Sequence, residues 1–453
     1  MTEKKSMLRV ASENFAVTSV GNLALKVLSI GATFFVLRAI DPYTYGLWQL
    51  LLSVVGAFGA LTLGSMSGVA VADISRALGE GDTARARLIL RKVAALFSSL
   101  GILAGLILVP LAPVIDQISG INLEDYLWIL AAAVAAGGIR QACQVAFQAY
   151  LEPIRAQLFQ ALNSALYLAG ILLLVVAGGQ GLLGIVISYA IATIAPVLFF
   201  APILLSRITL SRTEIRSGSY SFRHLWDEGR WTLLEDYVSA GIASLWPWLV
   251  GYFISIETVG QIGIALTLIS QVAAVAPLGY LLRGLLPRVA HDPERLHDWT
   301  VRSFRYSFWS NVFVGTGVFI AASILFPILF PKYVAAIPLF GALLISLIPR
   351  SLNVILEWFY AVRDQQGFFI VSTTAQILSL LPLIPLLMYL GTNGFVVWYL
   401  LNTTAVILAC LLRFRARTGI SPTVRDLVTF DGQDWDYIRR FLARIASRFA
   451  STR

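Results

Sequence analysis

The sequence predicts an all-α membrane protein with about twelve transmembrane helices in two six-helix lobes. The prediction rests on composition, on apolar runs of spanning length, and on the distribution of basic residues along the chain. Of the 453 residues, 58% are hydrophobic and 13% are charged, whereas soluble domains carry about 25% charged residues. This composition excludes a disordered chain, a collagen and a secreted disulfide scaffold, and it leaves a protein that crosses a membrane several times.

Twelve apolar runs are long enough to cross a bilayer, which takes about 20 residues of helix. Transmembrane β-strands would instead show short segments of alternating polarity, and the sequence contains no such alternation. The runs are therefore predicted to be helices. They lie at roughly 14–37, 46–70, 93–115, 127–151, 157–177, 182–205, 231–254, 258–282, 306–330, 335–359, 368–390 and 394–412.

Basic residues predict the orientation, because cytoplasmic loops are enriched in lysine and arginine. With a cytoplasmic N-terminus, 29 of the 34 basic residues fall in cytoplasmic segments, two in outer loops and three inside spans. A missed span would invert this pattern. Both termini are therefore predicted to be cytoplasmic. The net charge of +9 reflects this bias, so a nucleic-acid partner is not expected. The first run is interrupted by Lys26, unlike a cleavable signal peptide, and is expected to stay as the first helix.

Two segments are predicted to lie on the membrane surface. In 435–450, apolar residues share one helical face and arginines occupy the rest, as in an interfacial amphipathic helix. Segment 219–230 is a second candidate. Anionic lipid at the cytoplasmic face is the expected partner of both segments, and docking to another protein is the alternative.

The second half of the chain repeats features of the first. An offset of 210 residues takes Arg140 to Arg350, Tyr150 to Tyr360 and Lys26 to Asp236, and the sequence TYG at 44–46 matches TVG at 258–260. The predicted organisation is a first lobe at 1–205, a basic cytoplasmic linker at 206–230, a second lobe at 231–412 and a cytoplasmic tail at 413–453. Because each half has an even number of spans, a pseudo-two-fold axis along the membrane normal would relate the lobes.

Three basic residues, Lys26, Arg140 and Arg350, fall inside predicted spans. A charge at mid-bilayer costs about 2.5–3.5 kcal/mol on insertion scales, so these side chains should face protein or water. Polar residues accompany them at helical spacing, including Gln144 near Arg140 and Asn353 near Arg350. Such polar stripes predict a hydrated cavity between the lobes.

Two interpretations of these charges remain open. Lys26 could pair with Asp236, and Arg350 with Glu357. Alternatively Lys26, Arg140 and Arg350, with Gln144 and Asn353, line a cationic cavity that binds a phosphate group, because the guanidinium fork matches phosphate geometry. Glu235, Asp236 and Glu357 are candidates for a site that couples transport to an ion.

The sequence shows no sign of catalytic or cofactor chemistry. It lacks a Walker phosphate loop, a nucleophile triad, a metal-ligand cluster and a nucleotide-binding glycine pattern. No catalytic residue, metal or cofactor is therefore expected, and the protein is not expected to be an enzyme. Cys143 and Cys410 both fall in apolar runs and are expected to be small core residues.

Residues 37–82 resemble the first helix pair of polysaccharide exporters of the multidrug/oligosaccharidyl-lipid/polysaccharide (MOP) superfamily. The pattern is a helix ending at Arg38, then Pro42 and Tyr45-Gly46, then a helix that leads to Gly64 and a basic loop containing Arg76. The segment 252–270 resembles the matching part of the second lobe. The resemblance covers about residues 10–412 and concerns pattern and topology.

The resemblance implies the two-lobed fold of the MATE exporters and a place in the bacterial cytoplasmic membrane. It implies flipping of an undecaprenyl-diphosphate-linked oligosaccharide for surface polysaccharides such as O-antigen, and a possible complex with a polysaccharide polymerase. Lys26, Arg140 and Arg350 fit the cationic residues that line the cavity in this family. Glu235 and Asp236 depart from that pattern, because they place acid beside a cavity for a diphosphate.

Three other functions are alternatives to this one. A cation-coupled drug antiporter of the same superfamily is the main alternative, although such an antiporter is expected to have an acid in the cavity of the first lobe. A peptidoglycan-precursor flippase usually has fourteen helices. A glycan polymerase or ligase would need large outer loops, and here the outer loops are short.

Overall fold

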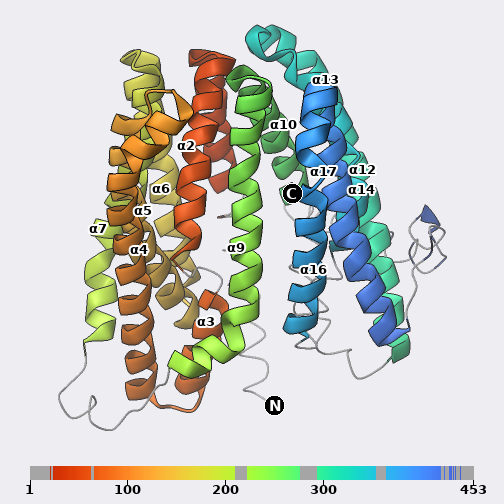
Figure 1. Cartoon of the computed structure of the whole chain (residues 1–453). Helices are drawn as coiled ribbons and strands as arrows, with labels where there is room; N and C mark the ends of the chain where they lie inside the picture. The colour runs from red at the N-terminus through yellow and green to blue at the C-terminus, as the bar shows by residue number, and fades with distance from the viewer. Residues whose placement is uncertain are drawn as a thin grey trace, which may run out of the picture. The chain divides into compact units, whose positions relative to one another are not determined.

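The computed structural model describes residues 24–62, 66–209, 222–275, 293–353 and 364–419, together with residue 21 and single residues of the C-terminal tail. Within these ranges the regular secondary structure is helical (Figure 1). Seven of the described helices are long and apolar enough to cross a membrane.

The first half of the chain begins with a helix over residues 24–39. It continues with α2 (Pro42–Ala60), α3 (Ser67–Gly79), α4 (Thr83–Ser119), α5 (Glu124–Ala149), α6 (Pro153–Gly170), the π-helix η2 (Ile171–Ala177) and α7 (Gly181–Ile208). The later part contains α9 (Phe222–Phe253), α10 (Ile256–Val275), α12 (Pro293–Leu329), η3 (Pro331–Tyr333), α13 (Ala336–Leu344), α14 (Leu347–Arg350), η4 (Ser351–Asn353), α16 (Gln365–Leu380) and α17 (Leu383–Thr418).

Local signals set several helix boundaries. The carboxylate of Asp41 accepts a hydrogen bond of 2.7 Å from the backbone N–H of Thr44 at the start of α2, and Pro42 fills the first turn, where its missing N–H costs little. Asp82 begins α4 in the same way. α4 ends at Gly120, whose φ of 65° is left-handed and suits a residue without a Cβ.

The predicted span 335–359 is interrupted in the structure. Its described part is divided into α13, α14 and the 3-10 turn η4. Pro349 explains part of this division, because it lacks the N–H that would bond to the carbonyl of Ile345 in a continuous helix. The predicted span 46–70 is also interrupted, since α2 ends at Ala60 and α3 begins at Ser67.

α17 includes the end of one predicted span and the whole of the next. Its backbone departs from helical geometry at Gly391, with φ 55° and ψ −129°. Only glycine adopts this conformation readily, so Gly391 marks the turn between the two spans. At the other predicted surface segment, residues 222–230 are continuous with α9. The amphipathic segment 435–450 lies almost wholly outside the described residues.

Small residues allow α4 and α5 to pack closely. A Cβ at Gly101 would lie 2.7 Å from the backbone nitrogen of Gly138, and one at Gly105 would lie 2.9 Å from the Cβ of Ala135. Gly101 and Gly105 are four residues apart and share one face of α4, as in the close helix pairs of membrane proteins. Both cysteines are buried, as expected for small core residues, and Cys143 belongs to the core around α4 and α5.

The chain divides into two compact units. The first contains residues 1–263 and 328–334, and the second contains 264–327 and 335–453. The first unit therefore includes α9 and the start of α10, which the sequence analysis assigns to the second lobe. The lobe boundaries at 205 and 231 remain a prediction.

Within the first unit, α2 and α10 meet through two glycines. A Cβ at Gly46 would overlap the carbonyl oxygen of Ile256, and a Cβ at Gly260 would overlap that of Pro42. Both pairs of equivalent positions, 42 with 256 and 46 with 260, are 214 residues apart. Gly46 meets Ile256, and its equivalent Gly260 meets Pro42, which is the equivalent of Ile256. This exchange is the reciprocal pattern of a two-fold contact. Gln49 and Gly263 have the same separation and also meet.

Part of the C-terminal tail docks on α12 in the second unit. Asp434 is fully buried and pairs with Arg305, and it accepts a hydrogen bond of 2.6 Å from the hydroxyl of Tyr306. The Trp309 ring stacks on Phe430. The predicted cytoplasmic tail is thus anchored to a helix at this point, a contact that the hydropathy and charge pattern does not predict.

Candidate functional site

The predicted site residues lie on helices of both units. Lys26 is on the helix over residues 24–39, Arg140 and Gln144 are on α5, and Glu235 and Asp236 are on α9; all five side chains are half-buried. Arg350 ends α14 and is also half-buried. Asn353 ends η4, but its side chain and the whole of Glu357 lie outside what the structure describes.

Arg140 lies within electrostatic range of a tyrosine on the last helix of the first half. Its guanidinium interacts electrostatically with Tyr189 of α7, and α5 packs directly on α7. The ring of Tyr189 meets Trp48 of α2 edge-on at 5.5 Å between centroids and Tyr167 of α6 at 6.5 Å. Rings from two other helices therefore fix the position of Tyr189.

Arg350 also has a tyrosine neighbour, in the second unit, and here the two side chains are in direct contact. Its Nη2 donates a hydrogen bond of 2.5 Å to the hydroxyl of Tyr399 on α17. The guanidinium carbon lies 5.5 Å from the centroid of the same ring, within range of a cation–π interaction. Phe395 stacks on the ring of Tyr399, with 6.0 Å between the ring centroids.

These two Arg–Tyr pairs are repeats of one another. Tyr189 and Tyr399 are 210 residues apart, which is the offset that relates Arg140 to Arg350. The same offset takes Gly181 to Gly391, both with left-handed φ values, of 52° and 55°. Neither tyrosine is among the site residues predicted from the sequence. Applying the known offset to every polar residue of the last span in each half would have found them.

The Arg–Tyr pairs leave the arginine charge available. Among the described residues, no carboxylate forms an ion pair with Arg140 or with Arg350. A phenol is neutral, so a neighbouring tyrosine does not cancel the charge of the guanidinium. In the second pair the Tyr399 oxygen accepts from Arg350, so its own proton can be donated to a further acceptor. Each pair can therefore offer both a cation and hydroxyl groups to an anion.

The acidic candidates for ion coupling on α9 also interact with neighbouring groups. Glu235 accepts a hydrogen bond of 3.0 Å from the hydroxyl of Ser239, one turn later on α9. Lys26, Glu235 and Asp236 all belong to the first compact unit, and each interacts with neighbouring groups. Pairing between Lys26 and Asp236 therefore remains a prediction. The described residues contain no cluster of three or more His, Cys, Asp or Glu side chains that could hold a metal.

No known protein family matches the sequence, and none of the curated proteins matches it. The structure, however, is similar to solved transporter structures. One is the inward-facing conformation of a multidrug resistance MATE family transporter of the MOP superfamily, with a TM-score of 0.73 and 15% identity, over 86% of this chain and 94% of that one.

Two other solved structures agree with this match. A eukaryotic MATE transporter has a TM-score of 0.65 and 14% identity, over 89% of this chain and 95% of that one. A MATE protein in a straight conformation has a TM-score of 0.61 and 15% identity, over 90% and 95% of the two chains. The chain is thus an all-α polytopic membrane protein with the fold of the MATE transporters of the MOP superfamily.

Proposed function

We propose that the protein is a transporter that moves a polyprenyl-diphosphate-linked oligosaccharide across the bacterial cytoplasmic membrane by alternating access. The single observation that carries the substrate class is the repeated Arg–Tyr pair at 140/189 and 350/399. Half-buried guanidiniums without a carboxylate partner among the described residues suit an anion with two phosphates. Lys26 is proposed as a third cation of the cavity, with Gln144 and Asn353 as polar contacts.

Elementary physics is consistent with this task. The sugar part of such a lipid is too polar to cross hydrocarbon, so it needs a hydrated path lined by polar side chains. The polyprenyl tail can remain in the bilayer. An inside-negative potential favours outward movement of a negative head group by about 2.3 kcal/mol per charge per 100 mV. Glu235, Asp236 and Glu357 are proposed as sites for an ion whose movement adds to this driving force.

Deletion of the gene tests the proposal directly. The flippase function predicts that one undecaprenyl-linked repeat unit accumulates on the cytoplasmic leaflet and that surface polysaccharide is lost. Extraction of lipid-linked sugars, followed by mass spectrometry, measures the pool, and plasmid-borne wild type should restore it. An unchanged pool would contradict the proposal. The proposal also includes cytoplasmic termini and a nearby polysaccharide polymerase, which tagging and co-purification can examine.

A cation-coupled drug antiporter is the second candidate, because one of the similar structures is described as a multidrug resistance transporter. This function predicts that deletion raises sensitivity to cationic dyes while the pools of lipid-linked sugar stay constant. The same deletion strain therefore separates the two functions. Arg140 has no carboxylate partner among the described residues, and this favours the anionic substrate, since a cation would be repelled from its surroundings.

Replacing Tyr399 with phenylalanine is expected to lower transport about tenfold while protein abundance stays unchanged. The ring contacts remain, but the hydroxyl that positions Arg350 is lost, and hydrogen bonds to charged groups contribute about 1.5–3 kcal/mol. Complementation of the deletion strain measures the effect. Tyr389→Phe is the matched control, because Tyr389 is exposed on α17. Equal activity of Tyr399→Phe and wild type would argue against a role for the pair.

A further inference from the structure

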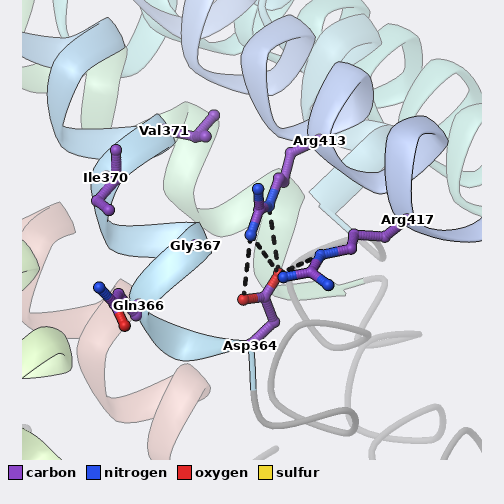
Figure 2. A pocket seen from close by; sticks show the side chains of 7 residues that line it. All are labelled: Asp364, Gln366, Gly367, Ile370, Val371, Arg413 and Arg417. Atoms are coloured by element: carbon purple, nitrogen blue, oxygen red, sulfur yellow. Dashed lines mark hydrogen bonds and ion pairs between the residues drawn. The ribbon is translucent and has the colours of Figure 1, made fainter.

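A cavity of about 290 Å³ opens in the second unit where α16 begins and α17 ends (Figure 2). A volume near the lower end of the range for ligand pockets, about 300–1,000 Å³, suits a head group better than an oligosaccharide. The lining residues are Asp364, Gln366, Gly367, Ile370, Val371, Arg413 and Arg417.

Two arginines share one carboxylate at this cavity. Asp364 Oδ2 lies 3.1 Å from Nη2 of Arg413 and 3.5 Å from Nε of Arg417. Figure 2 shows both guanidiniums pointing from α17 toward Asp364. The cluster therefore carries one positive charge in excess. Each guanidinium has five N–H donors, so donors remain after the contacts with Asp364, and the side chain of Arg417 is 56% exposed.

Gly367 allows this cluster to lie over the first turn of α16. A Cβ at this position would lie 2.5 Å from Nη2 of Arg413 and 2.6 Å from Oδ1 of Asp364. Any other residue would push the arginine and the carboxylate away from the helix. The backbone at the start of α16 thus adds the partial positive charge of a helix N-terminus to that of the arginines.

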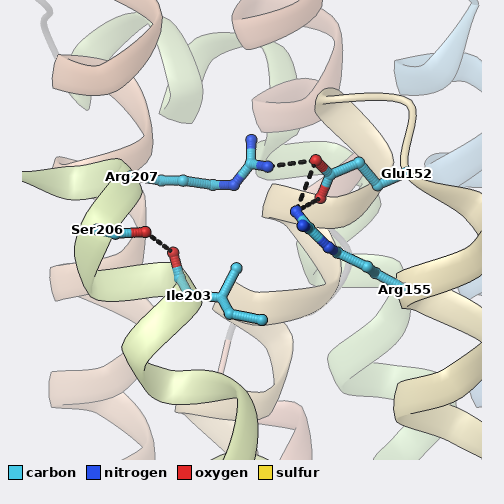
Figure 3. Close-up of polar contacts among 5 residues, drawn as sticks. All are labelled: Glu152, Arg155, Ile203, Ser206 and Arg207. Atoms are coloured by element: carbon cyan, nitrogen blue, oxygen red, sulfur yellow. Dashed lines mark hydrogen bonds and ion pairs between the residues drawn. The ribbon is translucent and has the colours of Figure 1, made fainter.

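The first unit contains a related cluster in which one arginine is covered. Glu152 pairs with Arg155 at 2.9 Å and with Arg207 (Figure 3), and Arg207 and Arg417 are 210 residues apart. The face of the Arg207 guanidinium is covered by the ring of Tyr150 at 4.2 Å, and its side chain is only 19% exposed. The arginine that is covered in the first unit therefore has an exposed equivalent, Arg417, in the second.

The position of the cavity along α17 also favours a charged head group. The apolar run of this helix ends at Leu412, and Arg413, Arg415 and Arg417 follow directly. Basic residues that flank an apolar span lie at the level of lipid phosphates. We propose that this cavity binds a phosphate group, either the head group of an anionic phospholipid or free phosphate, through Arg413 and Arg417. This site is separate from the Arg–Tyr pairs and does not depend on the proposed substrate.

Native mass spectrometry of the purified full-length protein tests the site, with phosphatidylglycerol and phosphatidylcholine as probes. Wild type is expected to retain phosphatidylglycerol preferentially. Arg413→Gln combined with Arg417→Gln should weaken that retention by about tenfold, because two charge-assisted hydrogen-bonding groups are lost. Arg417→Gln alone, at an exposed position that should not affect folding, should weaken it by a smaller factor.

Arg415→Gln is the matched control. Arg415 is exposed on the same part of α17, and this substitution removes the same charge as Arg417→Gln. Arg415 does not line the cavity, so retention should change less than about twofold. Competition with inorganic phosphate separates the two sources. If phosphate displaces the lipid from wild type but not from the double variant, free phosphate is a ligand of the site. If wild type retains the lipid despite added phosphate, the lipid is the ligand. Equal losses in Arg415→Gln and the double variant, or no loss in either, would overturn the proposal.

Discussion

Arg140→Ala is expected to lower transport by about 10- to 100-fold while leaving a folded and slightly more stable protein. The loss follows from the charge-assisted hydrogen bonds that a guanidinium makes to phosphate, which contribute about 1.5–3 kcal/mol. The gain in stability follows from the cost of a half-buried cation, which no carboxylate offsets among the described residues. Lysine at this position should restore only part of the activity, because it lacks the planar fork.

Export of surface polysaccharide and the thermal stability of the purified protein measure these two effects together. Arg38→Ala is the matched control, since Arg38 is exposed at the end of the first helix and its loss should change neither quantity. If Arg140 served only as a structural ion-pair partner, Arg140→Ala would instead lower stability. A variant that exports normally would show that Arg140 does not bind the substrate.

Gly260→Ala and Gly46→Ala are each expected to separate the N-terminal ends of α2 and α10. The added methyl group would overlap a backbone carbonyl of the facing helix, and backbone cannot move aside as a flexible side chain can. Overpacking of this kind costs about 1–3 kcal/mol, which shifts a two-state equilibrium by about 5- to 150-fold. We expect the protein to remain folded and to favour a conformation in which these helix ends lie apart.

Spin labels at Tyr43→Cys and Glu257→Cys can report the separation, because both positions are exposed at these helix ends. The native Cys143 and Cys410 are buried and should not react. Gly59→Ala is the matched control: it lies on α2, and nothing within 4 Å would meet its Cβ. An unchanged distance distribution in Gly46→Ala and Gly260→Ala would refute the assigned role of this contact.

Hydropathy and charge bias could predict the helical membrane fold because both follow directly from the free energy of transfer into the bilayer. They could not show where the chain bends inside an apolar segment. The turn at Gly391 falls in a gap of three residues between two predicted spans, and so short a gap hardly changes the local composition. The interruption before Pro349 could in principle have been predicted, since proline removes a hydrogen bond in any helix interior.

The candidate site could be predicted only in part. Arg140 and Arg350 stood out because an intramembrane charge is costly wherever it lies. Tyr189 and Tyr399 did not, because tyrosine is common in membrane proteins and its partner depends on which helices pack together. The arginine clusters at Asp364 and Glu152 could not be predicted from the sequence either, since they differ in the exposure of their arginines and in the ring of Tyr150.

The burial of Tyr333 in the first compact unit has a consequence for synthesis of the protein on the ribosome. Its hydroxyl donates to the carbonyl of Ile40, 293 residues earlier in the chain, at 3.1 Å. At about 5–20 residues per second, translation needs about 15–60 s to span that interval. The first helices must therefore wait in the membrane, with the Ile40 carbonyl lacking this bond, until the ninth predicted span has been inserted. Chains that terminate before residue 334 would leave the N-terminal unit incomplete, and they are natural targets for membrane quality-control proteases.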